Sequence, residues 1–174
     1  MTLIARSDIS RADVLHPFMG YDAAHLLRAR GRQFGGHPML HWAPFNGPGR
    51  TWSYTGFADE VARLAGGLHA RGIRAGDRVL VHFENCPDTL LARFACWHLG
   101  AVAVLSNSHW MGPEIAPLQT SLGVRAAMTQ PKFFDRLSRH CPSLEWIAVT
   151  ETDAGEAPEP GWGAAKVDGF ASLY

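Results

Sequence analysis

The sequence predicts an α/β fold built on a mostly parallel, doubly wound sheet with flanking helices. Four short runs rich in Val, Leu and Ala alternate with segments of helical periodicity. The intervening helices supply the crossovers that parallel strands require. Strands buried on both faces are nearly continuous in apolar residues, as these runs are. The runs cover residues 78–83, 101–105, 125–129 and 146–150.

An arm, a short helix and a β-hairpin are expected to precede this sheet. Residues 1–20 show no periodicity and are interpreted as an extended arm. Apolar residues within 22–32 recur at helical spacing, and Gly31 is expected to end that helix. The turn formers at 46–49 lie between two strand-like runs, which predicts a hairpin. Its strands are expected at residues 39–42 and 50–54.

The next helix is expected to begin after Ser53, whose hydroxyl is a favourable N-cap. Gly66 and Gly67 fall inside this helix, where each costs about 1 kcal/mol relative to Ala. Close packing against a sheet is the expected compensation. Gly72 then ends the helix in the left-handed conformation. The buried stripe of the helix is expected to comprise Phe57, Val61, Leu64, Ala65 and Leu68.

Proline and glycine delimit the helices between the parallel strands. Pro87 suits a first helical position, with Asp88 beside it to complement the helix dipole, and Gly100 ends that helix. Pro117 lies within the following helix and is expected to cause a kink or a short 3₁₀ opening. A further helix is expected at 133–140. The residues expected to be buried by the Pro117 helix are Ile115, Leu118 and Leu122.

The C-terminal part is expected to be a loop followed by the start of a helix. Residues 151–163 are acidic and rich in Pro and Gly. Asp168 is expected to cap a helix whose apolar stripe starts with Phe170 and Leu173. A chain that stops one turn into a helix favours truncation. The predicted division is 1–37 for the arm and helix, 38–150 for the α/β portion and 151–174 for the loop and truncated helix.

Composition excludes several classes of function. Sixteen basic residues balance sixteen acidic ones, which gives no electrostatic case for nucleic acid. Three cysteines without a CxxC pair argue against a disulfide framework or a zinc site. The N-terminus lacks the apolar run of a signal peptide, and no stretch approaches the ~20 apolar residues of a membrane span. A cytoplasmic location is therefore expected.

The order of these signals resembles the N-terminal region of the adenylate-forming enzymes, the acyl-CoA synthetase and AMP-dependent synthetase and ligase superfamily. The strongest pieces are WSYTGFADEVARLAGGLHARGIRAGDRV and the block 85–105, within a resemblance that spans 38–150. In this family a carboxylate attacks ATP to give an acyl-adenylate and pyrophosphate. A thiol, usually that of CoA, then displaces AMP. The resemblance implies a parent acid–CoA ligase that uses ATP, Mg²⁺ and CoA.

The catalytic motifs of the family have no counterpart in this sequence. Its Ser/Thr/Gly-rich phosphate loop, magnesium-binding Thr-Glu pair, hinge residue and C-terminal lysine are all absent, and neither GxxxxGK[ST] nor GxGxxG occurs. No catalytic or metal-binding residue is therefore assigned. The resemblance implies an N-terminal fragment that is inactive alone, binds none of these cofactors tightly, and depends on the rest of its polypeptide. Uncovered strand edges would favour self-association.

Two loops after parallel strands hold the candidate ligand-binding residues, because open α/β sheets bind ligands at the carboxyl ends of their strands. The resemblance places both loops near the path of the CoA thiol and nucleotide. Lys132 is a candidate to meet a CoA phosphate, and Trp110, next to His109, a candidate to pack against pantetheine. The alternative for Trp110 is that it covers the edge of the sheet.

Two further polar positions have mainly structural interpretations. His82 and Glu84 share a face of a strand, and a hydrogen bond at the strand end is favoured over a catalytic pair. Asn85 suits the turn into the next helix, where its amide can act as a cap. A complete, non-catalytic α/β binding or interaction module remains the competing function. It would explain the missing motifs without truncation, but the interrupted last helix counts against it.

Overall fold

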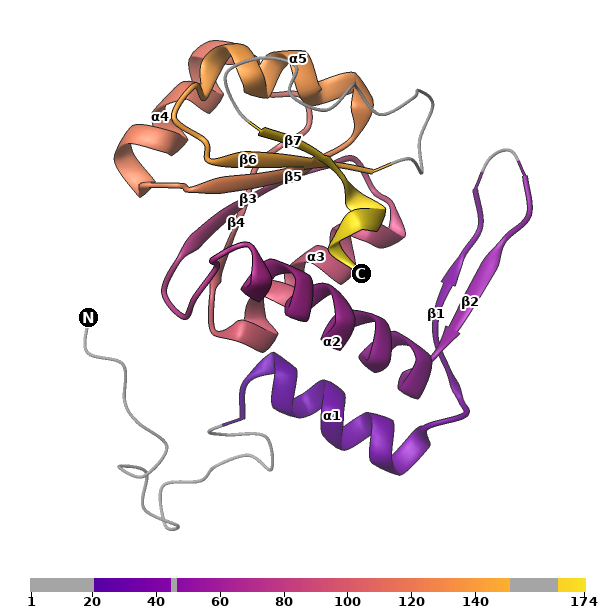
Figure 1. Ribbon diagram of the computed structural model, residues 1–174. Helices are drawn as coiled ribbons and strands as arrows, with labels where there is room; N and C mark the ends of the chain where they lie inside the picture. Colours follow the sequence, from indigo (N-terminus) through magenta and orange to yellow (C-terminus); the bar gives the residue numbers. More distant parts are fainter. Residues whose placement is uncertain (1–20, 45–46, 151–165) are drawn as a thin grey trace.

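The computed structural model describes residues 21–44, 47–150 and 166–174. Five strands form one parallel sheet in the order β4-β3-β5-β6-β7, and an antiparallel hairpin, β1-β2, lies beside it (Figure 1). The predicted α/β class with a parallel sheet is confirmed. The sheet strands are β3 (Arg78–His82), β4 (Val102–Leu105), β5 (Ala126–Thr129), β6 (Trp146–Val149) and β7 (Lys166–Gly169).

Helices cover both faces of the sheet (Figure 1). Side chains alternate along β3, so that Val79 and Val81 enter one core cluster and Leu80 enters the other. The first cluster lies under α2 (Tyr54–Ala70) and α3 (Pro87–Leu99), with α1 (Ala23–Phe34) packed on α2. The second lies under α4 (Gly112–Leu122) and α5 (Pro131–His140). None of the helices in the described ranges is long and apolar enough to cross a membrane.

The N-terminal elements follow the prediction with one correction. β1 (Pro38–Trp42) and β2 (Arg50–Ser53) form the expected antiparallel hairpin. Helix α1, however, does not end at Gly31 but continues to Phe34. Gly31 does not adopt a positive φ. A Cβ placed on Gly31 would lie 3.9 Å from Cβ of Ala58 and 3.9 Å from the carbonyl oxygen of Tyr54, so this glycine faces the start of α2. A helical glycine against a neighbouring helix was thus mistaken for a helix end.

Helix α2 begins and packs as expected, but its glycines serve a different contact. The hydroxyl of Ser53 accepts a hydrogen bond from the amide of Gly56 at 3.1 Å, and the predicted apolar stripe is buried. A Cβ on Gly67 would lie 1.8 Å from the carbonyl oxygen of Leu173, so this glycine admits the backbone of the C-terminal turn rather than a sheet. Among the described residues, no atom outside the adjoining helix backbone lies within 4 Å of a Cβ added to Gly66. Its helical cost is therefore not offset by close packing.

The helices between the strands confirm the proline and glycine signals in part. Pro87 opens α3, and Gly100 ends it at φ 72°. Helix α4 is continuous through Pro117, without the expected 3₁₀ opening. Ile115 is buried as expected, whereas Leu122 is 40% exposed. Burial decreases along α4, from Ile115 through the partly buried Leu118 to Leu122. The buried face of the helix is therefore shorter than its apolar periodicity predicts.

The C-terminal residues form a strand and a 3₁₀ turn instead of a capped α-helix. Asp168 lies in β7, and the residue before the turn η3 (Phe170–Leu173) is Gly169. Phe170 and Leu173 are buried, as a shared stripe predicted. The segment Lys-Val-Asp-Gly of β7 has one apolar side chain, so its strand identity depends on pairing with β6. The arm expected at 1–20 and the loop expected at 151–163 lie outside the described residues.

Candidate functional site

The order of the strands reverses direction between β3 and β5, near the middle of the sheet. The chain runs outward from β3 to β4 and returns past β3 to β5, so α3 and α4 lie on opposite faces (Figure 1). Open α/β sheets bind ligands beyond the carboxyl ends of the strands at such a reversal. We call this place the switch-point edge. The hydroxyl of Thr129 there donates to the carbonyl oxygen of His82 at 2.7 Å, which ties the two strand ends together.

Polar side chains of the two loops leaving the switch-point edge bind one another. The backbone amide of Glu84 donates to the side-chain oxygen of Gln130 at 2.8 Å. The ammonium of Lys132 lies 2.5 Å from Oε2 of Glu84, and both side chains are partly exposed. An exposed ion pair of this kind contributes little stability. Lys132, the candidate for a CoA phosphate, therefore already has an anionic partner.

The loop after β4 carries the other two candidate residues. His109 is exposed, and its backbone amide donates to Oδ1 of Asn107 at 2.9 Å. Trp110 is half-buried and packs against the core cluster under α4 and α5. Arg136 of α5 holds the loop by donating from Nη1 to the carbonyl oxygens of Ser108 at 3.0 Å and Trp110 at 2.6 Å. Part of Trp110 thus packs against the protein's own core.

His82 is fully buried beside this loop and is neutral. Its Nδ1 lies 2.7 Å from the hydroxyl oxygen of Ser106, and its ring meets the ring of Phe133 edge-on, with centroids 4.8 Å apart. Nε2 has no hydrogen-bond partner among the described residues. Burial, with a smaller effect from the charge of Arg136, lowers the pKa of His82 to about 4.

Among the described residues no hydrogen bond joins His82 and Glu84; Nδ1 of His82 pairs with Ser106, and Glu84 pairs with Lys132. Strand β3 ends at His82, so the alternation that places the two residues on one face no longer applies at Glu84. No hydrogen bond, ion pair or ring contact joins His109 or Trp110 to Lys132 within the described residues. Sequence reasoning missed Arg136 altogether, since its role arises only when α5 packs beneath the loop.

The described residues hold no cluster that fits Mg²⁺, and the cations at the switch-point edge already have partners. Within the described ranges, no group of three or more His, Cys, Asp or Glu side chains is placed to hold a metal ion. The cations near the switch-point edge, Lys132 and Arg136, bind a carboxylate and backbone carbonyls. A phosphate would have to displace these partners.

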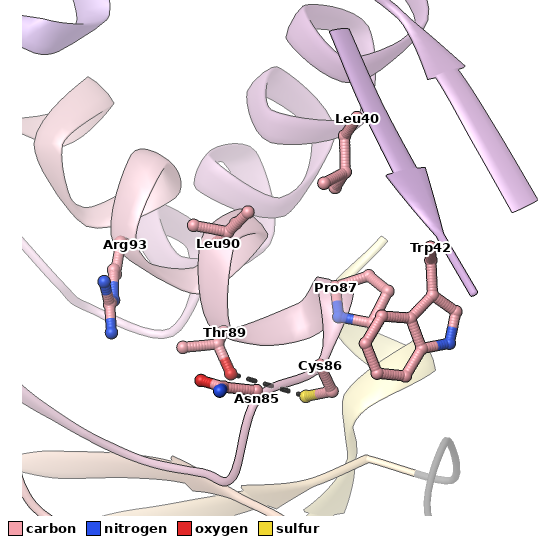
Figure 2. Close-up of a pocket in the computed structure, with 8 residues that line it drawn as sticks. All are labelled: Leu40, Trp42, Asn85, Cys86, Pro87, Thr89, Leu90 and Arg93. Carbon is pink, nitrogen blue, oxygen red and sulfur yellow. Dashed lines mark hydrogen bonds between the residues drawn. The ribbon is translucent and has the colours of Figure 1, made fainter. Parts of the chain in front are cut away.

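A second hollow lies where the hairpin meets the start of α3 (Figure 2). Its volume is about 230 Å³, and we call it the hairpin pocket. Asn85, the expected cap, lines this pocket; the N-cap position belongs to Cys86, which makes no side-chain capping bond. No local sequence pattern indicates the pocket, because it combines residues of β1 with residues at the start of α3. Its lining residues are Leu40, Trp42, Asn85, Cys86, Pro87, Thr89, Leu90 and Arg93.

Comparisons with known proteins agree with the fold and its resemblance. The model of the AMP-binding enzyme family matches residues 27–168. A crotonobetaine/carnitine–CoA ligase from Salmonella paratyphi A is 32% identical over 101 residues, which cover 58% of this chain and 20% of that protein. The chain thus aligns with about a fifth of the length of this curated relative.

Solved structures of two ligases share the fold over small parts of their own chains. The anthranilate CoA ligase AuaEII in complex with anthranoyl-AMP superimposes with a TM-score of 0.75 at 21% identity, over 98% of this chain and 29% of that one. Coronafacic acid ligase from Pectobacterium brasiliense superimposes with a TM-score of 0.70 at 20% identity. The match covers 86% of this chain and 28% of that one. Because the family model covers most of the sequence, the chain belongs to the AMP-binding enzyme family, the adenylate-forming ligases.

Proposed function

We propose that this chain is the N-terminal portion of an ATP-dependent acid–CoA ligase that acts through an acyl-adenylate. The family match over residues 27–168 carries the proposal. The names of the relatives support the choice of reaction, since they describe CoA ligases and an acid ligase. We assign the groups that act on ATP, Mg²⁺ and the acid to the remainder of a longer polypeptide, since the sequence lacks the catalytic motifs of the family.

The proposed division of the chain is an arm and helix at 1–37, the α/β portion at 38–150, and a C-terminal segment at 151–174, of which β7 and η3 pack onto the α/β portion. Edge strand β4 supports the view that further chain covers this portion. Val102 and Leu105 on that strand are both nearly half exposed. Exposed apolar side chains on an unpaired edge promote association, so the chain alone is expected to self-associate.

The candidate CoA path runs along the loops that hold His109, Trp110 and Lys132. In the complete ligase, Lys132 would exchange Glu84 for a CoA phosphate, which is a stronger and doubly charged acceptor. Trp110 would offer pantetheine the part of its ring that the core leaves exposed. This role is compatible with the partial exposure of both side chains.

Acid-dependent ATP–pyrophosphate exchange tests the proposal. We expect no exchange by the 174-residue chain with any member of a carboxylic-acid panel, and exchange together with CoA thioester formation by the full native open reading frame. The matched control is the full protein with the lysine of its downstream phosphate loop replaced by Ala, which should lose exchange.

Two results would contradict this function. Exchange by the 174-residue chain, in preparations free of host ligases, would show that its own residues activate ATP. A native reading frame that stops directly after Tyr174 would favour the complete, non-catalytic binding module instead.

A further inference from the structure

The hairpin pocket is apolar on one side and polar on the other (Figure 2). Leu40 and Trp42 enter it from β1, and Leu90 lies opposite them on α3. Asn85 and Arg93 line the side away from the hairpin. Ligand pockets commonly combine a mostly apolar wall with a few polar groups that fix orientation. A volume of about 230 Å³ restricts this one to small ligands.

Helical spacing brings the α3 contributions onto one face. Arg93 lies four positions after Thr89 and three after Leu90, the spacings at which neighbours on a helix surface meet. The hydroxyl of Thr89 is already used, since it donates to the carbonyl oxygen of Glu84 at 2.9 Å. Arg93 is therefore the strongest hydrogen-bond donor on this face.

The guanidinium of Arg93 is incompletely satisfied. Its Nε is buried and has no hydrogen-bond partner among the described residues. Buried donors in native structures are nearly always paired, and a charged donor more strictly than a neutral one. A guanidinium presents its donors in a planar fork that matches a carboxylate or sulfonate. Nε itself is shielded from solvent, so the half-exposed remainder of the guanidinium is the part that an anion in the pocket can reach.

The electrostatics of the pocket favour the same kind of ligand. Its eight lining residues include one cation and no carboxylate. The amino terminus of α3 opens beside it without a side-chain cap. Asp88, the acidic residue of the first turn, binds Thr150 and does not line the pocket.

We propose that the hairpin pocket binds a small organic anion, with its ring or short chain between Trp42 and Leu90 and its carboxylate or sulfonate on Arg93. The pocket selects for charge and apolar area together: a neutral ring lacks the partner for Arg93, and inorganic phosphate lacks the apolar body. This inference does not depend on the proposed function, because it rests on residues of this chain alone.

Two probes of nearly equal shape test the proposal: naphthalene-1-sulfonate and its neutral analogue naphthalene-1-sulfonamide. We expect the sulfonate to bind the chain more tightly than the sulfonamide in a titration followed by ligand NMR. Arg93→Gln should raise the Kd of the sulfonate about tenfold and leave that of the sulfonamide unchanged, because it removes a charge-assisted hydrogen bond. Arg93→Lys should give an intermediate Kd.

Matched variants separate this pocket from other surfaces. Arg28→Gln removes an exposed arginine of α1 and should not change either Kd. Arg30→Gln alters a second apolar hollow, lined by Leu26, Met39 and others, and should also have no effect. Leu90→Trp fills the hairpin pocket and should weaken both probes, so the proposal stays testable if Arg93→Gln does not fold by circular dichroism.

Three results would overturn the proposal. The first is no measurable binding of the sulfonate. The second is equal loss in Arg93→Gln and Arg28→Gln, or a loss that appears in Arg30→Gln instead. The third is unchanged binding in Leu90→Trp.

Discussion

The switch-point edge and the hairpin pocket both begin where β3 ends, yet their polar groups are satisfied differently. At the switch-point edge, Glu84 binds Lys132 and Gln130, and Arg136 binds the carbonyls of the next loop. One residue further along the chain, Asn85 leads into a pocket where Nε of Arg93 has no partner among the described residues. Nε2 of the buried His82 at the switch-point edge also lacks a partner among the described residues. The two regions therefore differ in their cations: Lys132 and Arg136 are paired, and Nε of Arg93 is not.

The contrast has an energetic basis. A ligand at the switch-point edge must replace hydrogen bonds that the protein already makes, so only the surplus contributes to affinity. A ligand on the half-exposed guanidinium of Arg93 displaces no hydrogen bond or ion pair among the described residues. The switch-point edge is accordingly arranged to hold its loops in this chain, and the predictions below test whether its internal contacts act as described.

The largest expected effect is a loss of stability at acid pH caused by His82. The folded state holds the pKa of this buried ring at about 4, below its ordinary value of 6.5. Between these pH values the unfolded state binds more protons, so the free energy of unfolding rises with pH. A difference of this size corresponds to about 3 kcal/mol, fully present above pH 6.5 and lost as the pH falls toward 4.

Urea unfolding between pH 7 and pH 4 measures this effect. The His82→Leu variant should lose less stability over that range than the wild type, because Leu cannot bind a proton. Replacing the exposed His98 by Gln is the control and should keep the wild-type dependence. Parallel curves for His82→Leu and the wild type would show that His82 does not titrate as described.

A smaller effect is expected from Arg136, which joins α5 to the loop after β4. Arg136→Gln removes two charge-assisted hydrogen bonds to the carbonyls of Ser108 and Trp110, and should lower the free energy of unfolding by about 1–3 kcal/mol. It should also move the pKa of His82 upward, because the charge of Arg136 helps to lower it.

The matched control for that variant is Arg139→Gln on the same helix. Arg139 is 74% exposed and pairs only weakly with Asp135, at 3.3 Å. Its replacement should change stability by less than about 0.5 kcal/mol. Equal effects of the two substitutions in urea unfolding would mean that the Arg136 contacts do not fix the loop.

The smallest effect is expected from the ion pair at the switch-point edge itself. Lys132→Gln and Glu84→Gln should each change the free energy of unfolding by less than about 1 kcal/mol, since both side chains are partly exposed. The double variant measures their coupling, which should also be small. A coupling well above 1 kcal/mol would mean that Lys132 is too firmly held to leave Glu84 for a phosphate.

Local signals in the sequence were sufficient for most of the fold. The cap at Ser53, Pro87 at the start of α3 and the left-handed glycine at Gly100 all act within a few residues, and the structure confirms each. Apolar runs typical of buried strands predicted the four strands β3 to β6, and the structure contains them. The strand β7 was missed, because Val167 pairs with Ile147 of β6 and its own segment has no periodicity.

The candidate site was less predictable, because its contacts join elements far apart in the chain. Gly67 was recognised as an unusual helical residue, but its partner Leu173 is not evident from spacing. Lys132 was singled out by its position after a strand, whereas its pairing with Glu84 required the strand order. The hairpin pocket combines Trp42 with the start of α3, and no local pattern connects them.

Backbone-amide NMR during a titration with naphthalene-1-sulfonate compares the two regions most directly. The largest shift changes are expected at Asn85, at 89–93 and at Leu40 and Trp42, with little change in the loops 106–111 and 130–132. Changes concentrated in those two loops would contradict the account, since they would show that the switch-point edge, and not the hairpin pocket, has the free binding capacity.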